Sequence, residues 1–168
     1  MHAVSINNRL IRLLAAVLAI SISACASGPR QVRGELPLVS VDSLTRHNGE
    51  ITLLLAFRNV NDRAFPLNDI GIDMRLNEAK LVDTAHTPGI EISARSREVV
   101  RVRIPALAPG LAVLDQIAGG SPADEDRPGL VSAAWQLELT LIDERGRSRE
   151  TEASGFLHPV PGQPGRFR

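Results

Sequence analysis

The sequence predicts an all-β fold, an antiparallel β-sandwich with one short helix. Beyond Leu36, apolar and polar residues alternate in several segments, which is typical of strands with one buried face. One segment, residues 109–118, instead spaces its apolar residues as a helix does. Strands that each have a single apolar face bury it when two antiparallel sheets pack face to face. We therefore expect two stacked sheets, with the helix at one open end.

Four segments show the alternation clearly: "ITLLLAF" (51–57), "IGIDMRL" (70–76), "VRVRI" (100–104) and "WQLELTL" (135–141). In each segment the apolar positions point to one side, which we expect to face the core. These positions are Ile51, Leu53, Leu55, Phe57, Ile70, Ile72, Met74, Leu76, Val100, Val102, Ile104, Trp135, Leu137, Leu139 and Leu141.

The helix is predicted from Pro109 to Ala118, where "PALAPGLAVLDQIAGG" ends in a glycine pair that favours termination. Its apolar face is expected to contain Leu107, Leu111, Leu114 and Ile117. The stretch "GGSPADEDRPG" after it is predicted to be an exposed acidic loop. Residues 159–168, "PVPGQPGRFR", are expected to be disordered, because prolines cannot donate to a sheet.

Residues 1–24 have the pattern of a secretory signal peptide. Arg9 and Arg12 precede an apolar run, Leu13–Ala24, that is shorter than the roughly 20 residues of a membrane-spanning helix. The run ends in "ISAC", residues 22–25, which resembles the bacterial lipobox. This resemblance implies cleavage before Cys25, acylation of Cys25 and attachment to a membrane.

The residues after Cys25 bear on its destination. In Gram-negative lipoproteins an Asp directly after the cysteine favours the inner membrane, whereas Ala26 and Ser27 stand here. The resemblance therefore implies an outer-membrane lipoprotein that faces the periplasm. We expect residues 25–34 to form a tether and residues 35–158 to form the sandwich domain.

Composition excludes several classes of protein. The 168-residue chain has 19 basic and 19 acidic residues, and removal of Arg9 and Arg12 with the signal peptide leaves a formal charge of −2. A nucleic-acid binder would be strongly basic, so no nucleic-acid partner is expected. The single cysteine excludes an internal disulfide and a cysteine zinc cluster.

The segment Leu53–Asp83 resembles the late embryogenesis abundant type 2 family, also called the WHy (water stress and hypersensitive response) domain. Asn59-Val60-Asn61 stands at the family's Asn-Pro-Asn position, and Pro66-Leu67 stands at its following Pro-Leu or Pro-Ile step. Val60 replaces the family proline, and Asn77-Glu78 replaces a glycine-containing turn. The resemblance extends over about residues 36–157.

This resemblance implies a fibronectin type III/immunoglobulin-like sandwich and a non-catalytic role in desiccation or envelope stress protection. Asparagine tolerates left-handed backbone and bonds its own chain, so Asn59 and Asn61 are expected to shape the end of a strand. Pro66, at the family's following step, is expected to be structural as well. Ligand binding by the two asparagines remains the alternative.

No motif indicates an enzyme, a cofactor or a metal site. His47, His86 and His158 do not have the spacing of metal ligands. The sequence contains no nucleophile elbow and no phosphate-binding glycine loop. The acidic run at 123–127 lacks the ligand spacing of a calcium loop.

Four arginines, Arg95, Arg97, Arg101 and Arg103, share one strand parity and form a candidate anion-binding face. Lipid A phosphates, an acidic envelope polymer or a protein are the candidate partners, and the domain would then be a periplasmic adaptor or binding module. The alternative is a solvated face whose charge Glu138, or Glu150 and Glu152, neutralise across strands.

Overall fold

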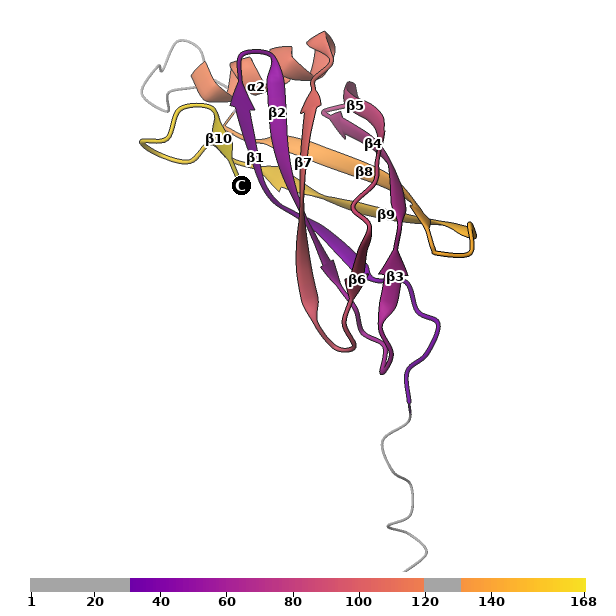
Figure 1. Ribbon diagram of the computed structural model, residues 1–168. Coiled ribbons are helices and arrows are strands. Elements are labelled where there is room, and N and C mark those ends of the chain that lie inside the picture. The colour runs from indigo at the N-terminus through magenta and orange to yellow at the C-terminus, as the bar shows by residue number, and fades with distance from the viewer. Residues whose placement is uncertain (1–30, 120–130) are drawn as a thin grey trace, which may run out of the picture. The chain divides into compact units, whose positions relative to one another are not determined.

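The computed structural model describes residues 31–119 and 131–168 (Figure 1). All described strands and the helix belong to one unit, Val32–Arg168. The predicted signal peptide, Cys25 and residues 120–129 of the predicted acidic loop lie outside the described residues. The elements are β1 (Leu38–His47), β2 (Glu50–Arg58), β3 (Phe65–Leu67), β4 (Asp69–Leu76), β5 (Ala79–His86), β6 (Ile90–Ile92), β7 (Arg97–Pro105), α2 (Ala108–Gly119), β8 (Ala133–Ile142), β9 (Ser148–Leu157) and β10 (Arg166–Phe167).

The strands form two four-stranded sheets and one two-stranded sheet. The first sheet has the order β10-β1-β2-β7, the second has the order β5-β4-β8-β9, and β3 pairs with β6. All of these pairings are antiparallel. In Figure 1, β8 and β9 run across behind β1, β2 and β7. The predicted all-β sandwich with one helix is confirmed.

The core includes every residue that the alternation predicted, and all of them are buried. It also contains residues outside those four segments, among them Leu44, Leu81 and Phe167. Phe57 is fully buried, and even the large Trp135 side chain is only 6% exposed. Burial of one such side chain contributes about 1.5–3 kcal/mol. A shift of one residue in any of these strands would turn its apolar set toward water, so the alternation also fixes the register.

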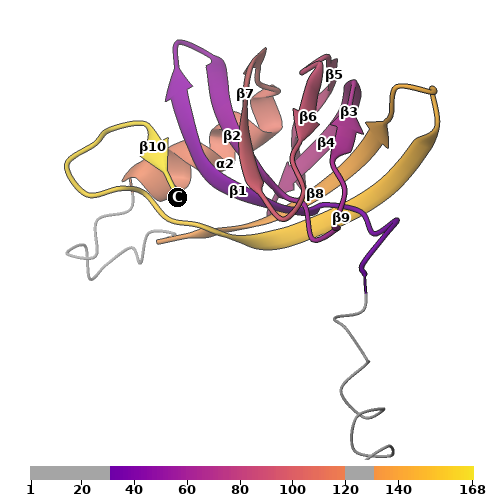
Figure 2. The same cartoon turned by 60° about the horizontal axis from the view of Figure 1, so that its bottom comes forward.

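The helix α2 extends one residue beyond the predicted helix at each end. It lies at one end of the sheets, at the top of Figure 1 and behind β2 and β7 in Figure 2. It packs mainly against β5, with smaller contacts to β4 and β8. Gly110 permits this approach, because a Cβ atom there would lie 2.5 Å from the Cα atom of Leu81 on β5.

The buried face of α2 differs in part from the predicted one. Leu114 and Ile117 are buried as predicted, and Leu111 is half-buried. Leu107 lies before the helix and is 41% exposed, and Val113 is buried on the helix. Leu107 flanks the first turn of the helix: its carbonyl accepts from the Leu111 N–H, and its own N–H, which has no acceptor within the helix, pairs with the Leu81 carbonyl of β5.

The prediction of a disordered C-terminal tail was wrong. β10 pairs with β1, placing Phe167 opposite Leu44, and Phe167 is only 1% exposed. The prolines do not prevent this, because the donors come from other residues: the N–H of Val160 bonds the Arg166 carbonyl. The tail folds back on itself, and burial of its one aromatic side chain holds it to the sheet.

The predicted tether is shorter than residues 25–34. The backbones of Val32 and Asp62 are joined by a 3.0 Å hydrogen bond, and the Val32 N–H also donates to the Asp62 carboxylate at 2.8 Å. Arg149 of β9 donates to the Gly34 carbonyl at 3.0 Å. Residues 32–34 are therefore held to the domain, and residues 25–30 lie outside the described part of the chain.

Candidate functional site

Three of the four predicted arginines lie on the outer face of β7, the edge strand of the first sheet. Arg97, Arg101 and Arg103 are exposed, whereas Val100 and Val102 between them point into the core. Arg58 of β2 stands directly opposite Arg97 and is also exposed. We call this surface, with Arg58, Arg97, Arg101 and Arg103, the arginine face.

Arg95 does not belong to the arginine face, contrary to the prediction. It lies in the turn before β7 with a φ of 58°, so strand parity does not apply to it. Its guanidinium pairs with the Asp62 carboxylate at 2.9 Å. The hydrogen bond from Arg95, together with that from the Val32 N–H, lowers the pKa of Asp62.

The arginine face is partly neutralised, but by carboxylates other than the expected ones. Arg97 pairs with Asp42 of β1, and Arg103 lies 3.4 Å from Glu50 of β2. Arg101 has no carboxylate within ion-pair distance among the residues that the structure describes.

The expected neutralising residues are on the other sheet. Glu138 belongs to β8, and Glu150 and Glu152 belong to β9. Strand parity alone does not reveal which sheet contains a strand, so the sequence could not distinguish these carboxylates from Asp42 and Glu50.

The second sheet has a row of four carboxylates on its outer face, which was not predicted from the sequence. Asp83, Asp73, Glu138 and Glu152 stand directly opposite one another on β5, β4, β8 and β9. Like charges in this relation destabilise a sheet. Parity shows that each of these side chains faces outward, but only the pairing register shows that they form a row. We call it the acidic row.

Lys80 neutralises one end of the acidic row. Its ammonium nitrogen lies 2.6 Å from an Asp83 carboxylate oxygen and 3.0 Å from one of Asp73. The hydrogen bonds to Asp83 and then to Asp73 raise the pKa of Lys80. In the described chain, no ion pair reaches Glu138 or Glu152. A hollow of about 510 Å³ lies over this row.

Asn59 and Asn61 form a buried network at the end of β2. Asn59 is 1% exposed, and its side-chain amide donates to the carbonyls of Arg63, Ile92 and Ser93 at 2.8–3.1 Å. The Asn59 side-chain oxygen accepts from the backbone and the side chain of Asn61 at 2.9 and 2.8 Å. The network supports the predicted structural role, because its hydrogen-bonding groups are used within the domain.

Pro66, the third motif residue, lies on β3 opposite Glu91 of β6. It is half-buried in the small sheet. β3 follows Asn61 in the chain and pairs with β6, to which Asn59 is hydrogen-bonded. All three motif residues therefore lie at the same end of the domain.

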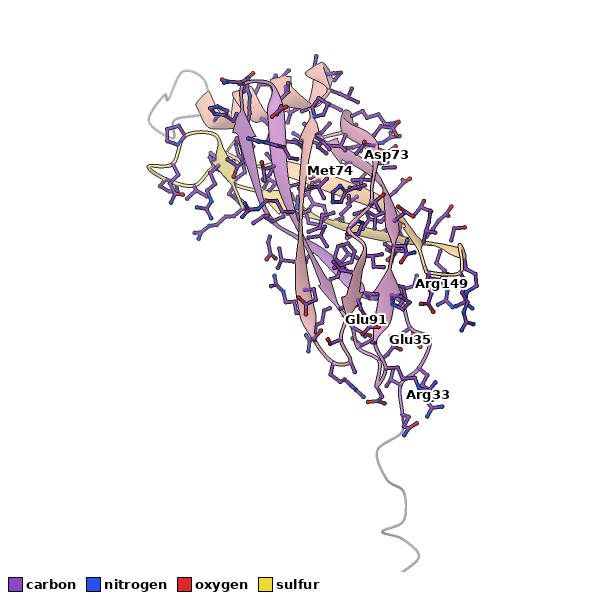
Figure 3. All side chains as sticks on the ribbon, viewed as in Figure 1. Arg33, Glu35, Asp73, Met74, Glu91 and Arg149 are labelled. Atoms are coloured by element: carbon purple, nitrogen blue, oxygen red, sulfur yellow. The ribbon has the colours of Figure 1, made fainter. Side chains whose placement is uncertain are left out.

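A second hollow, of about 470 Å³, lies near the N-terminal segment and is rich in arginine. Figure 3 shows Arg33, Glu35 and Arg149 at the end of the domain away from α2. Arg147 in this hollow pairs with Asp143 at 2.6 Å and lowers the pKa of that carboxyl group. Because the Asp143 carboxylate engages Arg147 and the Gly34 carbonyl engages Arg149, we assign these two arginines a structural role.

The described residues contain neither a metal-binding cluster nor a membrane-spanning helix. Residues 31–119 and 131–168 contain no cluster of three His, Cys, Asp or Glu side chains arranged for a metal ion. In the same ranges, no helix has the length and apolar character needed to cross a bilayer.

Comparison with solved structures shows what fold the chain shares. The solution structure of AT1g01470 from Arabidopsis thaliana is similar over 84% of this chain and 94% of that chain, with a TM-score of 0.51 and 12% identity. The similarity to a protein from Archaeoglobus fulgidus extends over 75% of this chain and 98% of that chain, with a TM-score of 0.43 and 13% identity. The similarity to At2g46140.1, provisionally named as a late embryogenesis abundant (LEA) protein, extends over 95% of this chain and 94% of that chain. Its TM-score is 0.45 and its identity is 14%.

No protein-family model and no curated protein matches the sequence. The similarity to AT1g01470 therefore establishes a shared fold, and the function must be argued from the residues of this chain.

Proposed function

We propose that this protein is a non-catalytic bacterial lipoprotein of the outer membrane whose WHy-like domain protects the envelope during desiccation or envelope stress. One observation carries the proposal. The segment that resembles the family, Leu53–Asp83, runs from within β2 to within β5, and both of its motif asparagines are buried. Asn59 joins the end of β2 to β6 by donating to the Ile92 carbonyl, and Asn61 bonds Asn59 and Glu35. The shared fold with AT1g01470 is in keeping with this proposal.

Membrane attachment through Cys25 is the first part of the proposal. One acyl chain gives marginal membrane binding, whereas several chains give stable anchoring. Cys25→Ala should abolish palmitate incorporation and release the protein from membranes, with Ser27→Ala as the control. Persistent membrane association of Cys25→Ala would contradict the lipid anchor.

The outer-membrane location is the second part, and it depends on the residue after the cysteine. Ala26→Asp should move the protein from the outer-membrane to the inner-membrane fraction of a density gradient, and Ala26→Asn should leave it in place. An unchanged distribution of Ala26→Asp would argue against sorting by this residue.

Protection is the third part. A compact domain held at high density on a membrane separates partly dehydrated surfaces and keeps them from associating. The test dries and rehydrates a fragile reporter enzyme with the mature-length chain, residues 25–168 with Cys25→Ala. An equal mass of an unrelated β-sandwich is the control. Recovery well above that control supports shielding, and recovery equal to it contradicts a direct protective role.

A second candidate function, a periplasmic adaptor for an anionic partner, is favoured by the unpaired Arg101. Arg101→Glu with Arg103→Glu should then abolish capture of the partner by crosslinking in the envelope. Unaltered capture would exclude the arginine face as the binding site.

A further inference from the structure

The two outer faces of the sandwich differ in charge. Along each strand the outward positions alternate with the buried ones, so the charged residues of each face follow from the pairing. On the first sheet they are Arg58, Arg97, Arg101, Arg103 and Arg166 with Asp42 and Glu50. On the second sheet they are Asp69, Asp73, Asp83, Glu138, Glu150 and Glu152 with Arg75 and Lys80. The first face is therefore net positive, and the second is net negative.

Both outer faces expose apolar side chains: on the second sheet Phe156 of β9 is 65% exposed, and on the first sheet the exposed apolar residues lie beside the arginines. Val99 lies between Arg97 and Arg101 on β7 and is 45% exposed. Leu38, the first residue of β1, stands opposite Arg58 and is 59% exposed. Guanidinium groups with a short apolar side chain between them suit the boundary of a bilayer, where phosphates lie above acyl chains.

The chain connects this face closely to the proposed anchor. The hydrogen bonds between Val32 and Asp62 attach the chain to the domain seven residues after Cys25. Seven extended residues span at most about 25 Å. Leu38 follows Val32 by six residues and already belongs to the arginine face. An acylated Cys25 would thus keep this face within one short tether of the membrane surface.

From the charge, the apolar side chains and the tether, we infer that the arginine face docks on the anionic phospholipid surface of the membrane that holds Cys25. The acidic row on the opposite sheet is repelled by that surface and faces the periplasm. This inference rests on the proposed lipid anchoring for the identity of the membrane. The partner of the arginine face is then the anionic phospholipid surface, an assignment that does not follow from the fold alone.

The test uses the mature-length chain, residues 25–168 with Cys25→Ala, so that no acyl chain contributes. Flotation with vesicles of phosphatidylcholine alone is compared with flotation with vesicles that also contain phosphatidylglycerol. The protein should bind only the second kind, and rising salt should weaken binding because it screens the charges.

Two variants with the same change in net charge locate the binding face. Arg101→Glu should weaken partitioning of the protein onto the anionic vesicles by about tenfold or more. The substitution removes one attractive charge and adds one repulsive charge near the anionic surface. Arg75→Glu, on the opposite sheet, should leave partitioning nearly unchanged. Thermal melts of both variants check that they fold, and Arg101 makes no ion pair in the described chain whose loss would unfold it.

Several outcomes would overturn the inference. These are equal flotation with both kinds of vesicle, no flotation with either, or an equal loss for Arg101→Glu and Arg75→Glu. Inhibition by inorganic phosphate at the concentration of the lipid phosphate would indicate a simple phosphate site. Stronger binding to soluble polyphosphate than to vesicles would indicate an acidic polymer. Since the assay contains no lipidated protein, its failure is distinguishable from failure of the Cys25 anchor.

Discussion

Asn61 and Glu35 exchange two hydrogen bonds, and this exchange fixes the point where the chain enters the domain. The Glu35 N–H donates to the Asn61 side-chain oxygen at 3.0 Å, and the Asn61 amide donates to the Glu35 carbonyl at 2.8 Å. Asn61 is 4% exposed whereas Glu35 is exposed, so both bonds are partly shielded from water. Together with Asn59, it couples the N-terminal segment to the ends of β2 and β6.

Asn59→Ala should lower the free energy of unfolding by about 2–3 kcal/mol, because it leaves buried carbonyls without their donor. Urea denaturation of the mature-length chain measures this loss. The matched control is Asn68→Ala, since the Asn68 side chain is exposed and should change stability by less than about 0.5 kcal/mol. Equal effects of the two substitutions would show that the asparagine network is not stabilising.

Phe167→Ala should cost about 3–5 kcal/mol, the usual range for loss of a buried phenylalanine. A disordered tail would predict no change, so the midpoint of thermal unfolding decides between the two descriptions. Arg166→Ala, at the exposed neighbouring position, serves as the control and should have little effect.

Gly110→Ala should destabilise the domain by about 1–3 kcal/mol, since the added Cβ would collide with the backbone of Leu81. Gly119→Ala lies in the same helix with no atom within 4 Å of the added Cβ. Better helix propensity should make that variant neutral or more stable, by up to about 1 kcal/mol. Denaturant titration of the pair tests the close contact of α2 with β5, and destabilisation by Gly119→Ala alone would contradict it.

Acid should weaken the domain partly through Asp62. The Arg95 hydrogen bond lowers the pKa of Asp62 below the ordinary value of 3.8, so the unfolded state binds this proton first as pH falls. The stabilisation is complete above the unfolded value and is lost as pH falls through the lower folded value. Asp62→Asn should therefore reduce the difference in urea midpoint between neutral pH and about pH 2. An unchanged difference would show that the Arg95 contact does not stabilise the folded state.

The strand interiors could be predicted from sequence because each has one buried face. Ile70 to Leu76 and Trp135 to Leu141 show their faces through alternation alone. β9 is harder, because most of its residues are exposed or half-buried and only Leu157 is buried. The C-terminal strand was missed because proline counts against a strand, whereas Phe167 is held by its own burial.

Of the two charged surfaces, the arginine face could be predicted from the sequence and the acidic row could not. Parity placed Arg97, Arg101 and Arg103 on one face within a single strand, and the structure agrees. The acidic row joins four strands that are distant in sequence, so it exists only through their register. No pattern within one segment contains that information.

The row formed by Asp83, Asp73, Glu138 and Glu152 has a consequence for a drying cell. As water evaporates, the solutes that remain become concentrated. At about 1 M salt the Debye length falls to roughly 3 Å, which is shorter than the ~5 Å between opposed Cβ atoms of neighbouring strands. Repulsion along the row is then largely screened, so the destabilisation that the row causes in dilute solution decreases as the salt concentration rises. The domain should accordingly withstand heat better as its surroundings lose water.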